Sequence, residues 1–365
     1  MEYRLDVIFD LQMGKTPSRN NPDYWNSKDN KWISIADLSK CDKYIFETKE
    51  YLSDKAIEES GISQIPANTV IMSFKLSIGK IAITPEPMYS NEAIMSFRDR
   101  HIMDLLPDYI YYMLLGKNWD IGTNKAVMGK TLNKATLSAI KVKVHSYSEQ
   151  KEIVRILDKV KSIIMIRQQE LQKLDELVKA RFVEMFGDPV QNPFKWNTKS
   201  LFEMGYCKNG MNFHTGDSGI EMHCLGVGDF KDYSVIDGTD NLPTISLNEV
   251  PSKERMLQDG DIVFVRSNGN KALVGRCLVI YPHNTPTTYS GFCIRYRLTS
   301  GDLNTAYLVH VLKTDSMRKK MTGRGANIQN LNQKILATLD IPTPPIELQE
   351  QFAVFVAQVD KSKVA

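Results

Sequence analysis

The chain has 365 residues, of which 42% are hydrophobic and 24% are charged, and its formal net charge is +3. This length favours two or three domains, and the composition is typical of a globular protein with a sizeable core. The slight charge neither requires nor excludes nucleic acid as a partner, because local clusters of charge matter more than the total.

The first residues mix acids with apolar side chains, which is not the pattern of a signal peptide. No apolar run approaches the roughly 18 residues that span a membrane. The five cysteines are odd in number and none has CxxC spacing, which favours reduced thiols. We therefore expect a cytoplasmic protein with no membrane partner.

Residues 1–147 are predicted to form a first globular unit. The segment NTVIMSFKLSIGKIAIT, from Asn68, contains two β-type runs around a polar, basic turn. The segment DYIYYMLLG, from Asp108, has the pattern of a short amphipathic helix. Short strands mixed with a few helices predict an α+β unit rather than a regular alternation of strands and helices.

Residues 148–187 are predicted to form a long central helix. Ser146 or Ser148 is a suitable N-cap, and Gly187 followed by Pro189 ends the helical pattern. Between these ends, apolar residues recur in alternating steps of four and three for about four heptads, with Arg167 in place of one apolar residue, and this pattern predicts a coiled coil. The residues of this seam are Ile153, Leu157, Val160, Ile164, Leu171, Leu174, Val178 and Phe182.

Residues 188–346 are predicted to form a second α+β unit that repeats the first. The basic turn between β-type runs recurs in GDIVFVRSNGNKALVGRCLVIY, YSNEAIMSF parallels YSGFCIRYRL, and DYIYYMLLG parallels NTAYLVHVLK. The apolar seam recurs as well, so residues 347–365 are predicted to begin a second long helix. At a constant offset, identical residues meet: Leu132 and Leu331, Asn133 and Asn332, Leu137 and Leu336, Gln150 and Gln349.

Two motifs resemble those of a known family. The central helix ends in LDELVKARFVEMFGDP, from Leu174, and each long helix is approached by a version of LNxxxLxxLxIPxPPxxxQ. The second copy, LNQKILATLDIPTPPIELQ, is close to this pattern, whereas the first, LNKATLSAIKVKVHSYSEQ, lacks its prolines. Over essentially its whole length, the chain resembles the specificity subunit of a type I restriction–modification system.

The resemblance implies both an architecture and a function. Residues 1–147 and 188–346 would be target-recognition domains, each reading one half of a bipartite site in double-stranded DNA. The long helices would pair antiparallel, act as a ruler between the two domains and dock the modification (methyltransferase) subunits. Restriction (nuclease and translocase) subunits are further expected partners. S-adenosylmethionine is expected on the modification subunit, while this chain is expected to be non-catalytic and without a cofactor.

Catalytic and metal-binding motifs that would indicate an enzyme are missing from the sequence. It contains no [DN]-P-P-[YF] run of an adenine methyltransferase, and the MGKT strings at Met13 and Met128 lack the upstream glycine of a P-loop. His214, His223 and Cys224 have neither a fourth ligand nor a recognised spacing, so no metal site is predicted. The helix alone would also permit a non-catalytic coiled-coil interaction or scaffold protein without DNA readout. The duplicated basic turns argue against that alternative.

Candidate DNA contacts lie in three polar, basic loops of each unit. Phosphate contacts need hydrogen-bond donors, and base readout needs amide, guanidinium or hydroxyl groups. In the first unit the candidates are Lys15, Thr16, Ser18, Arg19, Ser73, Lys75, Lys80, Lys130 and Thr131. In the second unit they are Asn212, His214, Thr215, Arg266, Ser267, Asn268, Asn270, Lys271, Arg276, Lys319, Lys320, Arg324, Asn327 and Gln329. We expect Arg266 and Asn268 to read bases, and Lys319, Lys320 and Arg324 to contact phosphates.

The second long helix is predicted to cover only the C-terminal end of the central helix. Antiparallel pairing would place Phe352 near Phe182 and Arg181, Val356 near Val178, and Val359 near Leu174. Ile153, Leu157, Val160 and Ile164 would then lack a partner within this sequence. Because an apolar stripe of this size seldom stays in water, we expect it to be covered by a second copy, by a modification subunit or in a longer natural chain.

Overall fold

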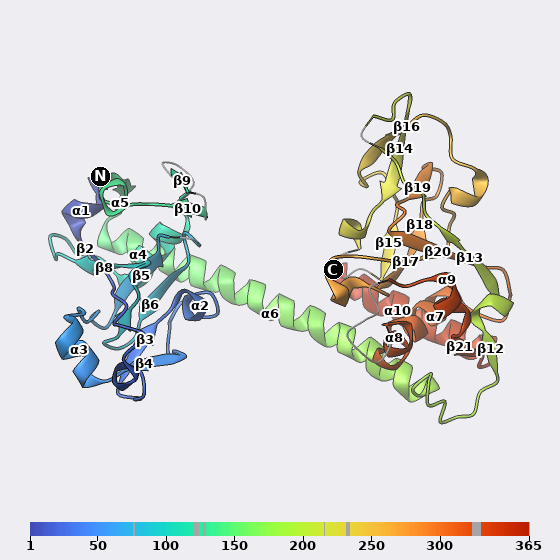
Figure 1. Cartoon of the computed structure of the whole chain (residues 1–365), viewed down its shortest axis with the longest axis horizontal. Coiled ribbons are helices and arrows are strands. Elements are labelled where there is room, and N and C mark those ends of the chain that lie inside the picture. Colours follow the sequence, from blue (N-terminus) through green and yellow to red (C-terminus); the bar gives the residue numbers. More distant parts are fainter. Residues whose placement is uncertain are drawn as a thin grey trace. The chain divides into compact units, whose positions relative to one another are not determined.

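The computed structural model describes residues 1–75, 77–119, 124–126, 129–214, 216–230, 234–322 and 330–364, with residues 124–126, 129–131 and 364 described by their backbone alone. The chain divides into two compact units, Met1–Arg167 and Gln168–Ala365. Their boundary lies inside one continuous helix, α6 (Tyr147–Phe186), which is green in Figure 1. The central helix predicted over residues 148–187 is therefore confirmed.

The first unit contains a four-stranded antiparallel sheet in the order β2-β8-β5-β6 and a three-stranded sheet in the order β4-β3-β7. The predicted runs around the basic turn are β5 and β6, and the predicted amphipathic helix is α4. The sheet strands are β2 (Phe9–Met13), β3 (Asn30–Ile33), β4 (Glu50–Leu52), β5 (Thr69–Ser73), β6 (Ile81–Thr84), β7 (Tyr89–Ser90) and β8 (Ile94–Asp99). The strand pairs β1 (Glu2–Arg4) with β11 (Lys141–Lys143) and β9 (Asn124–Ala126) with β10 (Gly129–Thr131) complete it. Its helices are α1 (Leu5–Ile8), α2 (Ile35–Leu38), α3 (Asp54–Ser60), α4 (Pro107–Leu115) and α5 (Lys134–Ala139).

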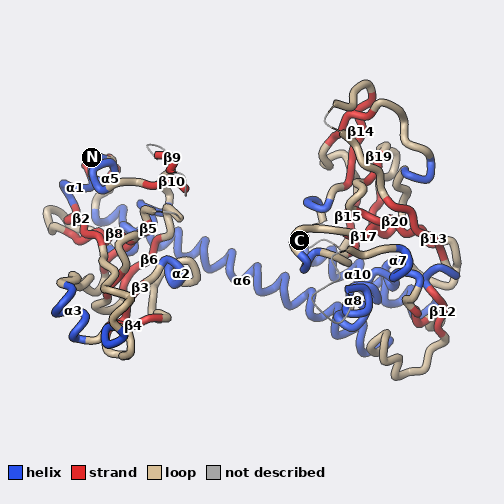
Figure 2. The backbone as a smooth tube through the Cα atoms, viewed as in Figure 1, coloured by secondary structure: helices blue, strands red, loops and turns tan. Residues whose placement is uncertain are grey.

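The second unit contains a five-stranded sheet, β13-β20-β17-β18-β15, and a three-stranded sheet, β16-β14-β19. In Figure 2 the α-helices labelled α7, α8 and α10 lie together on one side of the larger sheet, and the smaller sheet lies at the other end of the unit. The strands are β12 (Thr198–Ser200), β13 (Gly205–Asn209), β14 (Ile220–Leu225), β15 (Val235–Asp237), β16 (Thr244–Leu247), β17 (Asp261–Val265), β18 (Cys277–Tyr281), β19 (Thr287–Tyr289), β20 (Cys293–Leu298) and β21 (Asp340–Pro342). The helices are α7 (Thr305–Lys313), α8 (Asp315–Thr322), α9 (Gln333–Ala337) and α10 (Ile346–Val364).

The internal repeat predicted from the sequence is confirmed by matching hydrogen bonds. Gln150 accepts a hydrogen bond from the backbone N–H of Leu106 at 3.1 Å, and Gln349 accepts one from the backbone N–H of Asn304 at 2.9 Å. Leu106 and Asn304 are the N-cap residues of α4 and α7. Both glutamines are buried, so in each unit an amide from the following long helix satisfies the backbone donor at the start of the shorter one.

Local signals in the sequence account for both ends of α6. Ser146 and Glu149 form a reciprocal capping arrangement, with the Ser146 N–H donating to the Glu149 carboxylate at 2.8 Å and the Glu149 N–H donating to Ser146 Oγ at 3.4 Å. At the other end, Gly187 has φ +72°, and a Cβ at this position would lie 2.3 Å from the ring of Pro193. Only glycine fits such a left-handed, crowded position without strain, so the helix ends at Phe186.

The second unit pairs α10 antiparallel with the C-terminal part of α6, as predicted. The rings of Phe182 and Phe352 lie 5.5 Å apart, and Lys363, near the end of α10, forms a 2.7 Å ion pair with Asp175. Because the later residue on α10 meets the earlier residue on α6, the two helices run in opposite directions. The pairing residues share one core cluster, in which Leu174 is partly buried and Val178, Phe182, Phe352, Val356 and Val359 are buried.

The N-terminal part of the α6 seam is only partly as expected. Ile153 is half-buried against the core of the first unit, so the prediction that it lacks a partner is wrong. The Asp158 carboxylate holds the same turn of α6 through a 2.8 Å ion pair with Lys43. Leu157, Val160 and Ile164 are 36%, 46% and 54% exposed, and Leu171 is half-buried.

Two further findings concern the cysteines and the helices. All five cysteines are free thiols. Within the described part of the chain, no helix combines the length and the apolar character that crossing a membrane requires.

Candidate nucleic-acid interface

In the second unit, the candidate loops meet at the turn between β19 and β20. Pairing of β17 with β20 places Arg266, just beyond β17, beside this turn. The Arg266 backbone N–H donates to the Phe292 carbonyl at 2.8 Å, and its guanidinium Nη1 donates to the Gly291 carbonyl at 3.3 Å. Arg266 is therefore held at both its backbone and its side chain by a single turn.

The first candidate loop of this unit flanks the same turn. The Gly291 N–H donates to the Met211 carbonyl at 2.7 Å. A Cβ on Gly291 would lie 2.1 Å from the Asn212 side-chain oxygen, so a larger residue here would require the Asn212 side chain to move. Asn212 and His214 are both exposed.

The third candidate loop lies against the second at two places. Ser267 forms an antiparallel bridge with Asn330. The guanidinium of Arg318, on α8, donates to the carbonyls of Ala272 at 3.1 Å and Val274 at 3.2 Å. Lys319 and Lys320, in the last turn of α8, are exposed. The contacts from Arg318 therefore bring two exposed lysines close to the loop that carries the predicted base-reading residues.

These loops border a cavity of about 560 Å³. Its polar lining comes from the predicted residues Ser267, Asn268 and Lys271 together with Asn330, and Phe292 lies among them. The backbone of the loop is ordered by its own amide groups, since Asn268 Oδ1 accepts from the Asn270 N–H at 2.7 Å. The cavity therefore presents hydroxyl, amide and ammonium groups together, which is the chemistry that base edges and phosphates require.

The remaining candidates of the second unit lie elsewhere. Arg276 is half-buried and lines a separate cavity of about 620 Å³ beside α6, α8 and α10, so the structure does not bring it to the loop cluster. Asn270 is exposed, and its side chain accepts from the Ala272 N–H at 3.0 Å. Four candidates lie outside the described residues: Thr215, Arg324, Asn327 and Gln329.

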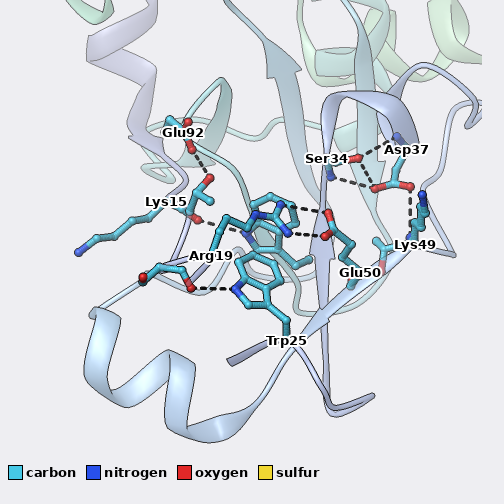
Figure 3. A network of polar contacts seen from close by, with 12 residues as sticks. Lys15, Arg19, Trp25, Ser34, Asp37, Lys49, Glu50 and Glu92 are labelled. Carbon is cyan, nitrogen blue, oxygen red and sulfur yellow. Dashed lines mark hydrogen bonds and ion pairs between the residues drawn. The ribbon is translucent and has the colours of Figure 1, made fainter. Parts of the chain in front are cut away.

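In the first unit, the loop from Lys15 to Arg19 is held by Trp25 and Trp32, and the Trp32 indole N–H donates to the Lys15 carbonyl at 3.1 Å. The Arg19 guanidinium lies 3.8 Å from the centre of the Trp25 ring and forms a two-point ion pair with Glu50. The Trp25 indole N–H donates to the Ser18 carbonyl at 3.0 Å. Figure 3 shows this network and shows the Lys15 ammonium directed away from it. The loop is thus fixed in place, while Lys15, Ser18 and Arg19 remain exposed.

An exposed carboxylate, Glu92, lies beside the same loop. Glu92 accepts a hydrogen bond from the Thr16 hydroxyl. Burial raises the pKa of Glu92, but the Thr16 hydrogen bond, a backbone hydrogen bond and the positive charges of Lys75 and Arg19 together hold that pKa below its ordinary value. Glu92 therefore stays ionised at neutral pH and balances part of the positive charge around it.

The second and third loops of the first unit place fewer of the predicted residues at the surface. Ser73 ends the fully buried strand β5, and its hydroxyl donates to the Ser77 carbonyl and accepts from the Lys80 N–H at 3.0 Å. It shapes the turn and cannot reach DNA, so this prediction is wrong. Lys75 is half-buried and Lys80 is exposed. For Lys130 and Thr131, the structure describes only the backbone of β10.

The two units hold their loops with the same backbone hydrogen bonds. The turn that begins at Tyr89 in the first unit and at Tyr289 in the second is called the Tyr-Ser turn; it ends at Ala93 and Phe292, respectively. One bond joins the first loop to the strand that follows the Tyr-Ser turn, and a second joins the basic turn to the Tyr-Ser turn. A third joins the segment before the long helix to the basic turn. In the second unit these are Gly210 to Cys293 (3.1 Å), Arg266 to Phe292 (2.8 Å) and Leu331 to Arg266 (2.7 Å). In the first unit they are Gly14 to Ile94 (3.1 Å), Phe74 to Ala93 (3.0 Å) and Leu132 to Phe74 (3.0 Å).

The prediction from sequence missed the Tyr-Ser turn as part of the site. Glu92 and Phe292 lie in the two copies of this turn, and both are exposed. The parallel between YSNEAIMSF and YSGFCIRYRL was visible, but the predicted DNA contacts were chosen among basic and amide side chains. The signal for this turn was the difference between the two copies, which have Glu92 in the first unit and Phe292 in the second.

The possible metal ligands lie in different surroundings. His223 Nδ1 is hydrogen-bonded to the Leu242 carbonyl at 2.9 Å, and Cys224 is a buried thiol, whereas His214 is exposed. Among the residues that the structure describes, no three His, Cys, Asp or Glu side chains are grouped as metal ligands.

The order β2-β8-β5-β6 recurs as β13-β20-β17-β18 in the second unit, where β15 adds a fifth strand. Because each unit also holds the same three loops around one turn, the two units define a duplicated domain. A family model described as type I restriction modification DNA specificity domain matches residues 1–176 and 227–365. This chain belongs to that family.

Curated relatives are similar to this chain at low identity. The specificity subunit of the type I restriction enzyme MjaIX from Methanocaldococcus jannaschii is 23% identical over 228 residues, which are 57% of this chain and 52% of that protein. The StySPI specificity subunit from Salmonella potsdam is 23% identical over 275 residues, 69% of this chain and 58% of that protein. The chain thus spans about half the length of the curated relatives that it matches.

Solved structures support the same fold. The S subunit of a type I restriction–modification system from M. genitalium aligns with a TM-score of 0.54 at 13% identity, covering 100% of this chain and 90% of that one. A chain from a structure of complex assembly and conformational transition in the type I R-M system aligns with a TM-score of 0.57 at 14% identity, with the same coverage. At such low identity, these similarities concern the fold alone.

Proposed function

We propose that this chain is the DNA-recognition subunit of a type I restriction–modification complex and that its two units each read one half of a bipartite site. The observation that carries the proposal is the repeated loop cluster. In both units, polar and basic loops converge on one Tyr-Ser turn through the same backbone hydrogen bonds. Such loops on a strand scaffold suit recognition of base edges and phosphates.

The proposed contacts fall into two classes. Arg266, Ser267 and Asn268 read base edges, because a guanidinium and an amide can each make two hydrogen bonds to one base. Lys319 and Lys320 contact phosphates, because an exposed ammonium on a helix end supplies charge without base specificity. In the first unit, the proposed contacts are Lys15, Ser18, Lys75 and Lys80, with Arg19 and Thr16 positioned by Glu50 and Glu92.

Other subunits would carry out the catalytic steps. Adenine methylation would belong to modification subunits that bind S-adenosylmethionine, and cleavage to restriction subunits, while this chain supplies recognition and a docking helix. The apolar residues Leu157, Val160 and Ile164 on α6 are exposed within this chain and are proposed to form part of that docking face.

The function is tested with the purified chain and with cells that carry it together with its modification subunit. The chain should shift duplex DNA in a salt-dependent manner, since phosphate contacts release counterions. It should transfer no methyl group alone, and sequencing of methylated DNA from the cells should reveal adenine methylation at one bipartite site. Methyl transfer by the chain alone, or methylation without site preference, would contradict the proposal.

The alternative of a coiled-coil scaffold without DNA readout is not favoured. The match to the DNA specificity family covers the first unit and most of α6 (residues 1–176) and residues 227–365 of the second unit. A scaffold would also leave the duplicated loop clusters without a role. If the chain shifted no DNA even at low salt, the coiled-coil scaffold would become the favoured function.

A further inference from the structure

Phe292 is fixed at its backbone and exposed at its ring. Its carbonyl accepts from the Arg266 N–H at 2.8 Å, and the preceding Gly291 donates to the Met211 carbonyl at 2.7 Å. The next residue, Cys293, is fully buried, whereas Phe292 is 60% exposed. The structure therefore anchors this turn in the core and presents one large apolar side chain outside it.

The surroundings of Phe292 distinguish it from other exposed phenylalanines. A single exposed apolar side chain is ordinary and needs no functional explanation by itself. Phe46, for example, is 59% exposed and lies outside the three loops of its unit. Phe292 instead lines the 560 Å³ cavity together with Ser267, Asn268 and Lys271. Its ring is thus the large apolar group among side chains that hydrogen-bond to bases or contact phosphates.

Base-pair chemistry indicates what such a ring would contact. Thymine alone presents a methyl group in the major groove, and phenylalanine is one of the side chains that contact it. The neighbouring hydroxyl and amide groups can bind the hydrogen-bonding edges of adjacent bases. On the basis of the proposed function, we infer that Phe292 contacts the 5-methyl group of a thymine in the half-site read by the second unit.

The first unit has no equivalent ring at this position. The residue that occupies the matching place in the hydrogen-bond pattern is Ala93, which is buried, and the exposed residue of that turn is Glu92. A carboxylate accepts hydrogen bonds and provides no apolar surface for a methyl group. The methyl contact is therefore assigned to one half-site only.

The test uses the complex of this chain with its modification subunit and compares thymine with deoxyuridine, which lacks the methyl group. The half-site of the second unit is first identified from the methylation pattern, by its loss or change in loop variants of that unit. Each thymine of that half-site, on either strand, is then replaced in turn, and dissociation constants are measured by fluorescence anisotropy. One replacement should weaken binding about four-fold, which corresponds to about 0.8 kcal/mol for one buried carbon group.

Phe292→Ala should weaken binding to the thymine duplex and remove the difference between thymine and deoxyuridine at that position. Phe292→Leu should keep part of the difference, and Phe46→Ala, matched in residue type and exposure, should keep all of it. Specific binding in which no thymine shows a methyl effect, or a methyl effect that survives Phe292→Ala, would overturn this inference while leaving the proposed function intact. A wild-type complex without any sequence preference would instead refute the proposed function.

Discussion

Phe352 is expected to carry much of the pairing between α10 and α6. Its ring is fully buried and lies 5.5 Å from Phe182, 5.6 Å from Phe186 and 5.1 Å from the His310 ring. Phe352→Ala therefore removes a buried aromatic side chain with three ring neighbours and leaves a cavity at the helix junction. Substitutions of this kind cost about 3–5 kcal/mol of unfolding free energy. For a unit of this size, at roughly 2–4 °C per kcal/mol, the transition should fall by about 6–20 °C.

The assay is differential scanning calorimetry, with the transition of the second unit followed separately because the two compact units need not unfold together. Val354→Ala is the control, since Val354 lies on the same helix and is 59% exposed. That change should alter the unfolding free energy by no more than about 0.5 kcal/mol. Hydrogen exchange should show lost protection in residues 174–186 and unchanged protection near residue 157. Equal effects of the two substitutions would show that α10 is not packed on α6 as the structure places it.

Arg266→Ala should relax or abolish sequence preference at one half-site and cost about 1–3 kcal/mol of binding, whereas Lys320→Ala should weaken binding to all sequences and lower the salt slope by about one. Identical binding profiles for the two variants would refute the division into base and phosphate contacts. Inserting four residues after Gln168 adds about 6 Å of helix and nearly preserves the seam. If α6 sets the spacing of the half-sites, their separation should grow by about two base pairs at roughly 3.4 Å each, and an unchanged separation in the methylation pattern would rule this out. Light scattering should show self-association of the isolated chain that weakens in Leu157→Lys. A monomer with unaltered stability would remove any packing role for this stripe.

Local signals in the sequence were sufficient to predict α6 and the repeat. Ser146 and Gly187 each act on their immediate neighbours at one end of α6, and the apolar heptad is a pattern along the chain. The ends and the apolar face of the helix can therefore be read without knowing the fold. Gln150 and Gln349 were visible as identical residues at matching places. Their shared role in capping α4 and α7 required the structure, because their backbone partners lie more than forty residues away along the chain.

Other properties depended on long-range packing. Ser73 is a residue type common in loops, but it lies at the end of a strand that is buried on both faces. Its hydroxyl is hydrogen-bonded within the following turn and is not free to contact DNA. Ile153 belongs to the heptad, yet it packs against the core of the first unit and does not need a partner helix to cover it. Neither outcome follows from spacing along the chain, since each depends on which distant element packs against the residue.

The sequence by itself determined the order of the elements, the duplication and the chemical character of the loops. Only the tertiary structure determined which side chains those loops bring together. Pairing of β17 with β20 placed Arg266 beside the turn that carries Phe292, and the Ser267 bridge to Asn330 drew the third loop against the second. Strand pairing joins residues that are far apart in the chain through backbone groups that every residue shares, so side-chain patterns alone do not reveal the neighbours of a loop residue.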